Sequence, residues 1–197
     1  MRSTGKCSGI TFIDSTSIKV CHNKRIFNHH VFGGLAKRGK STMGWFFGFK
    51  LHLIVNDKGE IINFVLTADN TDDRNLDMIE KLCKKVFGKL YGDRGYISNK
   101  LFQFLFNDGI HLVTNVRANM KNRLMPLRDK LLLRKRFIIE TINDQLKNIS
   151  QIEHSRHRSF IGFMINLISG LIAYCRQPKK PSIKVDYVRT NQLSFIC

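Results

Sequence analysis

The order of its periodic segments constrains the fold of this 197-residue chain more than any other feature. Three segments rich in β-branched and apolar residues come first, and Asn56-Asp57-Lys58-Gly59, between the second and third, has the composition of a hairpin turn. Helical patterns of apolar residues then alternate with two short strand-like segments. The predicted strands cover residues 9–20, 46–55, 60–67, 89–92 and 110–116, and the predicted helices cover 71–86, capped by Thr71 or Asp72, and 98–106. An antiparallel meander followed by alternating helices and strands predicts an α/β fold with a mixed sheet.

Basic segments interrupt this pattern at two places. Residues 21–44 lack periodicity and are predicted to be a long basic loop, and residues 117–136 a basic loop or mobile arm. Two helices follow, over 136–149 and 160–175; the second is strongly apolar but shorter than the roughly 20 residues needed to cross a membrane, so a buried core helix is predicted. We expect one domain over residues 1–177, with basic insertions at about 21–44 and 117–135, and a loosely ordered basic tail over 178–197.

Charge narrows the choice of partner. The chain has 33 Lys and Arg against 15 Asp and Glu, a net charge of +18, which favours a polyanion such as nucleic acid. This excess alone does not separate an enzyme from a packaging protein. Five dispersed cysteines without a C-x-x-C pair, and an N-terminus without an apolar core, predict a cytoplasmic protein with reduced thiols and no membrane partner.

Three acidic residues stand where the predicted elements would direct them inward. Asp14 lies within the first strand, Asp93 follows strand 89–92, and Glu140 lies on helix 136–149. Three converging carboxylates can hold a pair of Mg²⁺ ions, which catalyse phosphodiester cleavage and joining. Each acid also has a structural interpretation: a turn or capping acid, a turn residue paired with Arg94, and half of a surface ion pair, respectively. The structural interpretation is weakest for Asp14, because a carboxylate inside an apolar strand is costly to bury without a partner.

These acids lie within longer motifs. The segments concerned are Ile13-Asp14-Ser15, Cys21-His22-Asn23-Lys24-Arg25-Ile26, Gly48-Phe49-Lys50-Leu51-His52, Phe64-Val65-Leu66-Thr67 and Tyr91-Gly92-Asp93-Arg94-Gly95-Tyr96. Arg136, Glu140 and Lys147 have the spacing R-x₃-E-x₆-K, which places them on one face of a helix. In these motifs the chain resembles, over roughly residues 9–175, the catalytic domain of bacterial insertion-sequence transposases of the DDE class.

The resemblance implies a ribonuclease-H-like fold and a site for two Mg²⁺ ions, or Mn²⁺ in their place. It implies that the catalytic, metal-binding residues are Asp14, Asp93 and Glu140. It also implies that Arg136 and Lys147 approach the transposon-end DNA or its scissile phosphate; an ordinary salt bridge to Glu140, or a solvated helix face, is the alternative for both. Further DNA contacts are expected from Arg94, Lys50, Lys24 and Arg25, although Lys50 could equally be a plain surface lysine.

The chain departs from this family at two points. The tyrosine that often precedes the signature arginine by three positions is Leu133 here. Relatives usually carry a helical DNA-recognition domain before the first catalytic strand, whereas Asp14 comes almost at once. We therefore expect a fragment, a product of a split or frameshifted element, or a decayed copy.

The predicted function is metal-dependent DNA cleavage and strand transfer in the movement of an insertion sequence. The expected partners are transposon-end and target DNA, with a homo-oligomer as the active form and a location near the bacterial nucleoid. Two alternatives remain at this point: a ribonuclease-H-like nuclease that does not join strands, and an inactive or domesticated basic DNA-binding protein.

Overall fold

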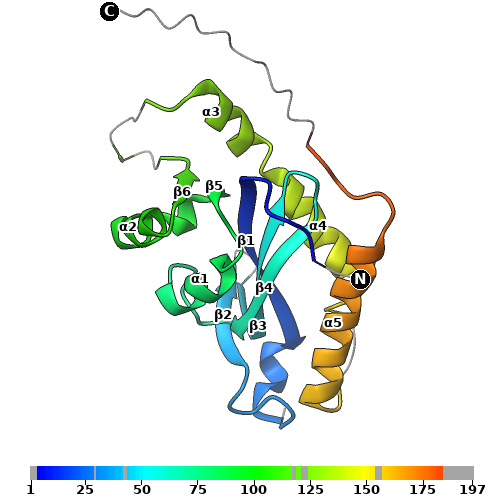
Figure 1. The fold of residues 1–197 in the computed structure, drawn as a ribbon. Coiled ribbons are helices and arrows are strands. Elements are labelled where there is room, and N and C mark those ends of the chain that lie inside the picture. Colours follow the sequence, from blue (N-terminus) through cyan, green and yellow to red (C-terminus); the bar gives the residue numbers. More distant parts are fainter. Residues whose placement is uncertain are drawn as a thin grey trace, which may run out of the picture.

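A computed structural model of the chain describes residues 4–28, 30–41, 44–116, 119–120, 124–153 and 157–183 (Figure 1). Its strands are β1 (Ile10–Cys21), β2 (Lys37–Ser41), β3 (Gly44–Asn56), β4 (Ile61–Ala68), β5 (Gly88–Gly92) and β6 (Ile110–Thr114). Its helices are α1 (Leu76–Cys83), α2 (Asn99–Asn107), α3 (Leu127–Arg134), α4 (Phe137–Asn148) and α5 (Phe160–Arg176). Two 3₁₀ turns, η1 (Asn23–Asn28) and η2 (Arg94–Tyr96), follow β1 and β5.

All of these strands belong to one mixed sheet. Its order is β2-β3-β1-β5-β6, and β4 also pairs with β3. Strand β1 runs antiparallel to β3 and parallel to β5, and β5 runs parallel to β6. Strands β2 and β4 use successive parts of β3: β2 pairs with its residues 44–48 and β4 with its residues 49–55. The predicted α/β class, with a three-stranded antiparallel meander and added parallel strands, is confirmed.

The turn between β3 and β4 is the predicted hairpin. The side-chain oxygen of Asn56 accepts hydrogen bonds from the backbone N–H groups of Lys58 and Glu60. Gly59 has a φ of 71°, in the left-handed region that glycine occupies without strain. The sequence Asn-Asp-Lys-Gly therefore supplies both the acceptor and the residue that this turn requires.

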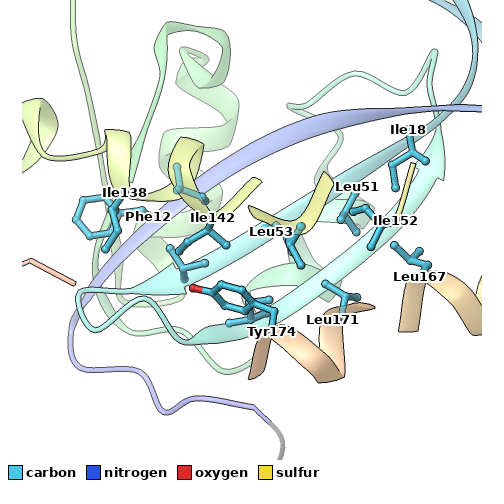
Figure 2. Close-up of a cluster of buried hydrophobic side chains, with 14 of the residues drawn as sticks. Phe12, Ile18, Leu51, Leu53, Ile138, Ile142, Ile152, Leu167, Leu171 and Tyr174 are labelled. Carbon is cyan, nitrogen blue, oxygen red and sulfur yellow. The ribbon is translucent and has the colours of Figure 1, made fainter. Parts of the chain in front are cut away.

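Both faces of the sheet are buried, because successive apolar residues of its strands point to opposite faces. Helices α4 and α5 cover one face, whose core is shown in Figure 2 and includes Phe12, Ile18, Leu51, Leu53, Ile138, Ile142, Leu167 and Tyr174. Helices α1 and α2 contribute to the core on the other face, which includes Ile13, Ile54, Ile79, Leu82, Leu101 and Leu105. Because successive side chains of a strand point to opposite faces, Asp14 shares the face of Phe12 and α4.

Two predicted loops contain regular structure. The segment 21–44 includes η1 and β2, and the segment 117–136 includes α3. Both predictions of a loop were wrong, because they were based only on the basic composition of these segments and their lack of apolar periodicity. Strand β2 is a short edge strand of basic residues without apolar alternation. Helix α3 is held by Leu132 and Leu133, which are buried in the core, and by a buried ionic contact of Asp129.

Helix α1 begins later than predicted. Its N-cap is Asn75, whose side chain accepts from the Met78 N–H at 3.0 Å. Asp72 instead accepts hydrogen bonds from the backbone and guanidinium of Arg74. The residues that looked like a cap therefore form the turn that precedes the helix.

Helix α5 is buried along one side. Phe163 and Leu167 lie in the core, while Ile161 and Ile165 on the outer side are exposed. No helix among the described residues is long and apolar enough to cross a membrane. Of the predicted tail, residues 184–197 lie outside the described part of the chain; before them, the Ile183 N–H donates to the Asp57 carbonyl at 2.8 Å.

Candidate active site

Strands β1 and β5 bring two of the predicted catalytic acids side by side. Phe12 of β1 is in register with Tyr91 of β5, and the two strands are parallel neighbours. Asp14 lies two residues after Phe12, within β1. Asp93 lies two residues after Tyr91, just past the end of β5. Parallel pairing therefore places the two carboxylates at the same level of the sheet.

Asp93 is held at the start of the 3₁₀ turn η2. Its side chain accepts a hydrogen bond from the Gly95 N–H at 2.9 Å. The preceding Gly92 lies against a neighbouring ring: a Cβ there would stand 3.1 Å from the Tyr96 ring. The Gly-Asp-Arg-Gly-Tyr motif thus turns tightly at the strand end and keeps the carboxylate close to β1.

Helix α4 supplies the third acid and a cation. Arg136, just before the helix, places Nη1 3.5 Å from Asp14 Oδ1 and Nη2 2.7 Å from Glu140 Oε1. One helical turn on, Asn143 donates from Nδ2 to Asp14 Oδ2 at 3.0 Å. These three side chains lie on one face because they are four and three residues apart. A guanidinium therefore stands between a strand carboxylate and a helix carboxylate.

Sequence reasoning missed Asn143. Its residue is only 7% exposed although it is polar, and it interrupts the buried positions Ile142 and Leu146 of α4. An amide three residues after Glu140, within the buried part of an amphipathic helix, is the signal that could have revealed it. The side chain of Asn143 supplies a hydrogen-bond donor to the buried carboxylate of Asp14.

The electrostatics of Asp14 connect all three acids. Burial raises the pKa of Asp14 from 3.8 to about 6; Arg136 opposes this shift, while the negative charges of Asp93 and Glu140 add to it. The side chain of Asp14 is 19% exposed, so its charge is poorly solvated. Glu140, by contrast, is 57% exposed and pairs with Arg136, so it does not point inward as predicted.

Tyr96 lies beneath the same carboxylates, in the core on the α1 side. Burial raises the pKa of the Tyr96 hydroxyl well above its usual range, and the charges of Asp73, Asp14 and Asp93 raise it further. Its hydroxyl therefore stays protonated near these acids. Tyr96 links the Asp14 side of the sheet to a second polar cluster on the opposite face.

That second cluster surrounds His52, which is fully buried on β3. Its Nε2 lies 2.9 Å from Thr67 Oγ1, and its Nδ1 lies 3.6 Å from Asp73 Oδ1. Burial lowers the pKa of His52 to about 4, against the opposing charge of Asp73, and nearby Lys50 lowers it further. Lys50 itself contacts the Thr71 carbonyl at 3.0 Å and Asp73 at 3.3 Å. Lys50 and His52 are therefore brought together on the face opposite Asp14.

The remaining predicted DNA-binding residues are dispersed. Lys147 forms a 2.9 Å ion pair with Glu153, whose other oxygen accepts from the Lys19 N–H, so it braces the end of α4 against β1. Arg94 is exposed on η2. Lys24 and Arg25 are exposed on η1, at the far end of β1. The structure thus gathers Asp14, Asp93, Glu140 and Arg136 but not these four cations, and their DNA contacts stay predictions.

The three carboxylates are chemically suited to a divalent metal ion, but their present positions do not form a metal site. Within the described residues, no three His, Cys, Asp or Glu side chains are arranged to hold a metal ion. Asp93 is turned to Gly95, and Glu140 is paired with Arg136. The chemistry of the site nevertheless fits a hard cation, because three carboxylates act on one another and a positive group already stands between two of them.

Comparison with known families matches residues 4–160 to the family described as the transposase DDE domain. A search of curated proteins finds no match. The chain is similar to a piggyBac transposase synaptic complex with hairpin DNA, with 16% identity and a TM-score of 0.42 over 61% of this chain and 27% of that one. It is also similar to a simian T-cell lymphotropic virus intasome in complex with the PP2A regulatory subunit B56 gamma, with 13% identity and a TM-score of 0.41 over 91% of this chain and 59% of that one. The chain thus spans less than two thirds of either of these.

Proposed function

Because the chain belongs to the family of transposase DDE domains, we propose that it cleaves DNA strands and joins them in the movement of an insertion sequence. Asp14, Asp93 and Glu140 are the catalytic carboxylates in this proposal. The observation that carries it is geometric: parallel pairing of β1 with β5 brings Asp93 to the level of Asp14, and Arg136 lies between Asp14 and Glu140, 3.5 and 2.7 Å from their oxygens. Burial also raises the pKa of Asp14, and such a carboxylate is suited to hold a cation that neutralises it.

Divalent ions are the proposed cofactor, with two Mg²⁺ or Mn²⁺ ions held by the three acids. Ions bound there supply an activated water or hydroxyl and stabilise the leaving oxygen in phosphodiester chemistry. Asn143 keeps the Asp14 carboxylate in one orientation through its 3.0 Å hydrogen bond. The η2 turn keeps Asp93 beside β1 through the Gly95 N–H.

Arg136 has a second task in the proposal. In the free protein its guanidinium neutralises part of the charge of Asp14 and Glu140. Guanidinium groups also bind phosphate through paired N–H donors. We propose that Arg136 turns to a DNA phosphate when the carboxylates bind metal, so that one cation serves both states.

The surface charge supports DNA as the partner. With a net charge of +18, the lysine and arginine side chains should bind DNA phosphates without sequence preference. This binding should weaken steeply as the salt concentration rises. Lys24, Arg25, Arg94 and Lys147 are proposed contacts, and Lys50 is the weakest candidate because it is paired with Asp73. Transposon-end and target DNA are the proposed substrates, and a homo-oligomer is the proposed active form.

The test uses labelled DNA from the ends of the element that encodes the chain, a supercoiled target plasmid, and Mg²⁺. Wild-type protein should give cleaved ends and joined products, and Asp93→Asn should give neither. Asp144→Asn is the matched control, because Asp144 is an exposed acid one turn after Glu140 on α4. Cleavage without joining would support the nuclease alternative instead, and full activity of Asp93→Asn would overturn the proposal.

A further inference from the structure

An exposed aromatic and basic surface lies at the end of the β2–β3 hairpin, away from the carboxylates. We call it the hairpin patch, and its residues are Lys24, Arg25, Phe27, Arg38, Lys40 and Trp45. Trp45 is 54% exposed and is in register with Lys40 of β2. Arg38 Cζ and Lys40 Nζ lie 5.4 and 5.7 Å from the indole centroid. The patch therefore presents a half-exposed indole with two cations over its ring.

The 3₁₀ turn η1 completes the patch. The side-chain amide of Asn23 donates a hydrogen bond to the Trp45 carbonyl, which ties η1 to the hairpin. Phe27 of η1 is 91% exposed, and Lys24 and Arg25 are exposed on the same turn. Two aromatic rings and four cations are thus presented by adjoining segments.

Folding alone does not account for the exposure of Trp45. The next aromatic residues of β3, Phe46, Phe47 and Phe49, are all buried, so this strand has apolar space for large rings on both faces. Trp45 remains outside the core, 54% exposed, and its contacts are with the cations of Arg38 and Lys40. An exposed aromatic residue among cations is typical of surfaces that bind a planar, anionic ligand.

The charge around the patch fits a polyanion. No Asp or Glu occurs between Asp14 and Asp57, while Lys and Arg occur seven times in that stretch. No acid from these strands or from η1 therefore competes with a ligand phosphate for Arg38 or Lys40. Nucleic acid is the polyanion whose bases also offer planar faces.

We propose that the hairpin patch binds unpaired nucleotides of DNA, with a base stacked on Trp45 and the flanking phosphates on Arg38 and Lys40. In duplex DNA the base faces are covered by their neighbours and only the edges are accessible, whereas an unpaired base offers a face to an aromatic ring. This inference extends the proposed function, because strand cleavage and joining create unpaired ends and displaced strands.

The patch is separate from the carboxylate site. Trp45 is eight residues along β3 from Leu53, the residue in register with Asp14, which is about 27 Å at the rise of a strand. Eight is an even number, so both lie on the same face of the sheet. A DNA strand could therefore contact both, while a substitution in the patch leaves the carboxylates unchanged.

Fluorescence tests the proposal directly, because Trp45 is the only tryptophan of the chain. The full chain is titrated with a single-stranded oligothymidylate and with a duplex of equal length, without divalent metal. We expect the single strand to quench the emission at least twofold at saturation and the duplex to quench it little. Trp45→Ala should weaken binding of the single strand by about fivefold to 150-fold, the range found for loss of one base–aromatic stack.

Matched variants separate stacking from charge and from folding. Trp45→Phe should keep most of the affinity, and Arg38→Gln with Lys40→Gln should reduce the dependence of affinity on salt, by about 0.7 in slope for each phosphate that the protein no longer neutralises. Phe87→Ala, which removes a 57% exposed ring outside the patch, should bind like wild type. Equal unfolding temperatures would show that all variants fold.

Three results would overturn the proposal: unchanged emission at saturating single strand, equal quenching by duplex, or unchanged affinity of Trp45→Ala. Asp93→Asn should show the same quenching as wild type. If the strand-transfer reaction fails but quenching persists, the proposed function falls and the nucleotide site stands. If quenching fails but joined products form, the reverse holds.

Discussion

Removing the charge of Asp14 should make the metal-free protein more stable. The pKa of Asp14 rises from 3.8 to about 6, mainly through burial. This is a shift of about two units, or about 3 kcal/mol at 1.4 kcal/mol per unit, by which the ionised form opposes folding at neutral pH. Asp14→Asn keeps the shape and can still accept the Asn143 hydrogen bond, and the lost attraction of Arg136 is already included in this net shift. We expect a gain of up to about 3 kcal/mol, or up to about 6–12 °C in unfolding temperature.

The raised pKa of Asp14 determines how the stabilising effect of Asp14→Asn depends on pH. A carboxyl whose pKa is higher in the folded than in the unfolded state holds its proton more tightly when folded. The contribution to stability is thus complete below pH 3.8 and is lost as pH rises through about 6. The stabilising effect of Asp14→Asn should therefore be full at pH 8 and small near pH 4. Asp93, Glu140 and Arg136 are the charged groups that face Asp14 and remain in both proteins.

Thermal unfolding in EDTA, at pH 4, 6 and 8, measures the effect. Asp144→Asn, on an exposed part of α4, is the control and should shift the unfolding temperature little at any of these pH values. A destabilised Asp14→Asn protein at pH 8, or a gain that is independent of pH, would refute the assignment of Asp14 as a buried acid with a raised pKa.

Three further predictions concern neighbouring residues. Arg136→Gln should tighten Mn²⁺ binding on the order of tenfold in calorimetry, because a competing cation is removed, while weakening DNA binding; unchanged Mn²⁺ affinity would contradict this. Asn143→Ala should lower strand cleavage about tenfold and stability by about 1–2 kcal/mol without changing DNA affinity, since Asp14 Oδ2 loses its donor; wild-type cleavage would contradict it. His52 should not titrate between pH 5 and 8 in NMR of its ring protons, because burial lowers its pKa to about 4; a midpoint near 6.5 would contradict the buried cluster.

Local patterns predicted much of the fold. The Asn56–Gly59 turn fixes the β3–β4 hairpin through its own side-chain and glycine chemistry, and Ser98 caps α2 as expected. Strand β2 and helix α3 could not be found in this way. Strand β2 depends on an edge of β3 contributed by a later part of the chain. Helix α3 depends on the contacts of Asp129 with Lys89 and Tyr91 and on the packing of Leu132 and Leu133 in the core.

The candidate site shows the same division. The motif spacing of Arg136 and Glu140 predicted that they share a helix face, and the apolar strand around Asp14 predicted a buried acid that needs a partner. The spacing did not reveal that Arg136 bridges the two acids, or that Lys147 is paired with Glu153, since these contacts depend on how α4 packs across the sheet. These contacts are set by the distances between α4 and the sheet, which the periodicity of the sequence does not reveal.

The central claim is that Asp14, Asp93 and Glu140 bind divalent metal together. Anomalous X-ray scattering from crystals soaked in Mn²⁺ tests it most directly. We predict a manganese peak in contact with all three carboxylates, with Arg136 moved away from Asp14. A peak elsewhere in the molecule, or no peak with Arg136 still between Asp14 and Glu140, would contradict the claim.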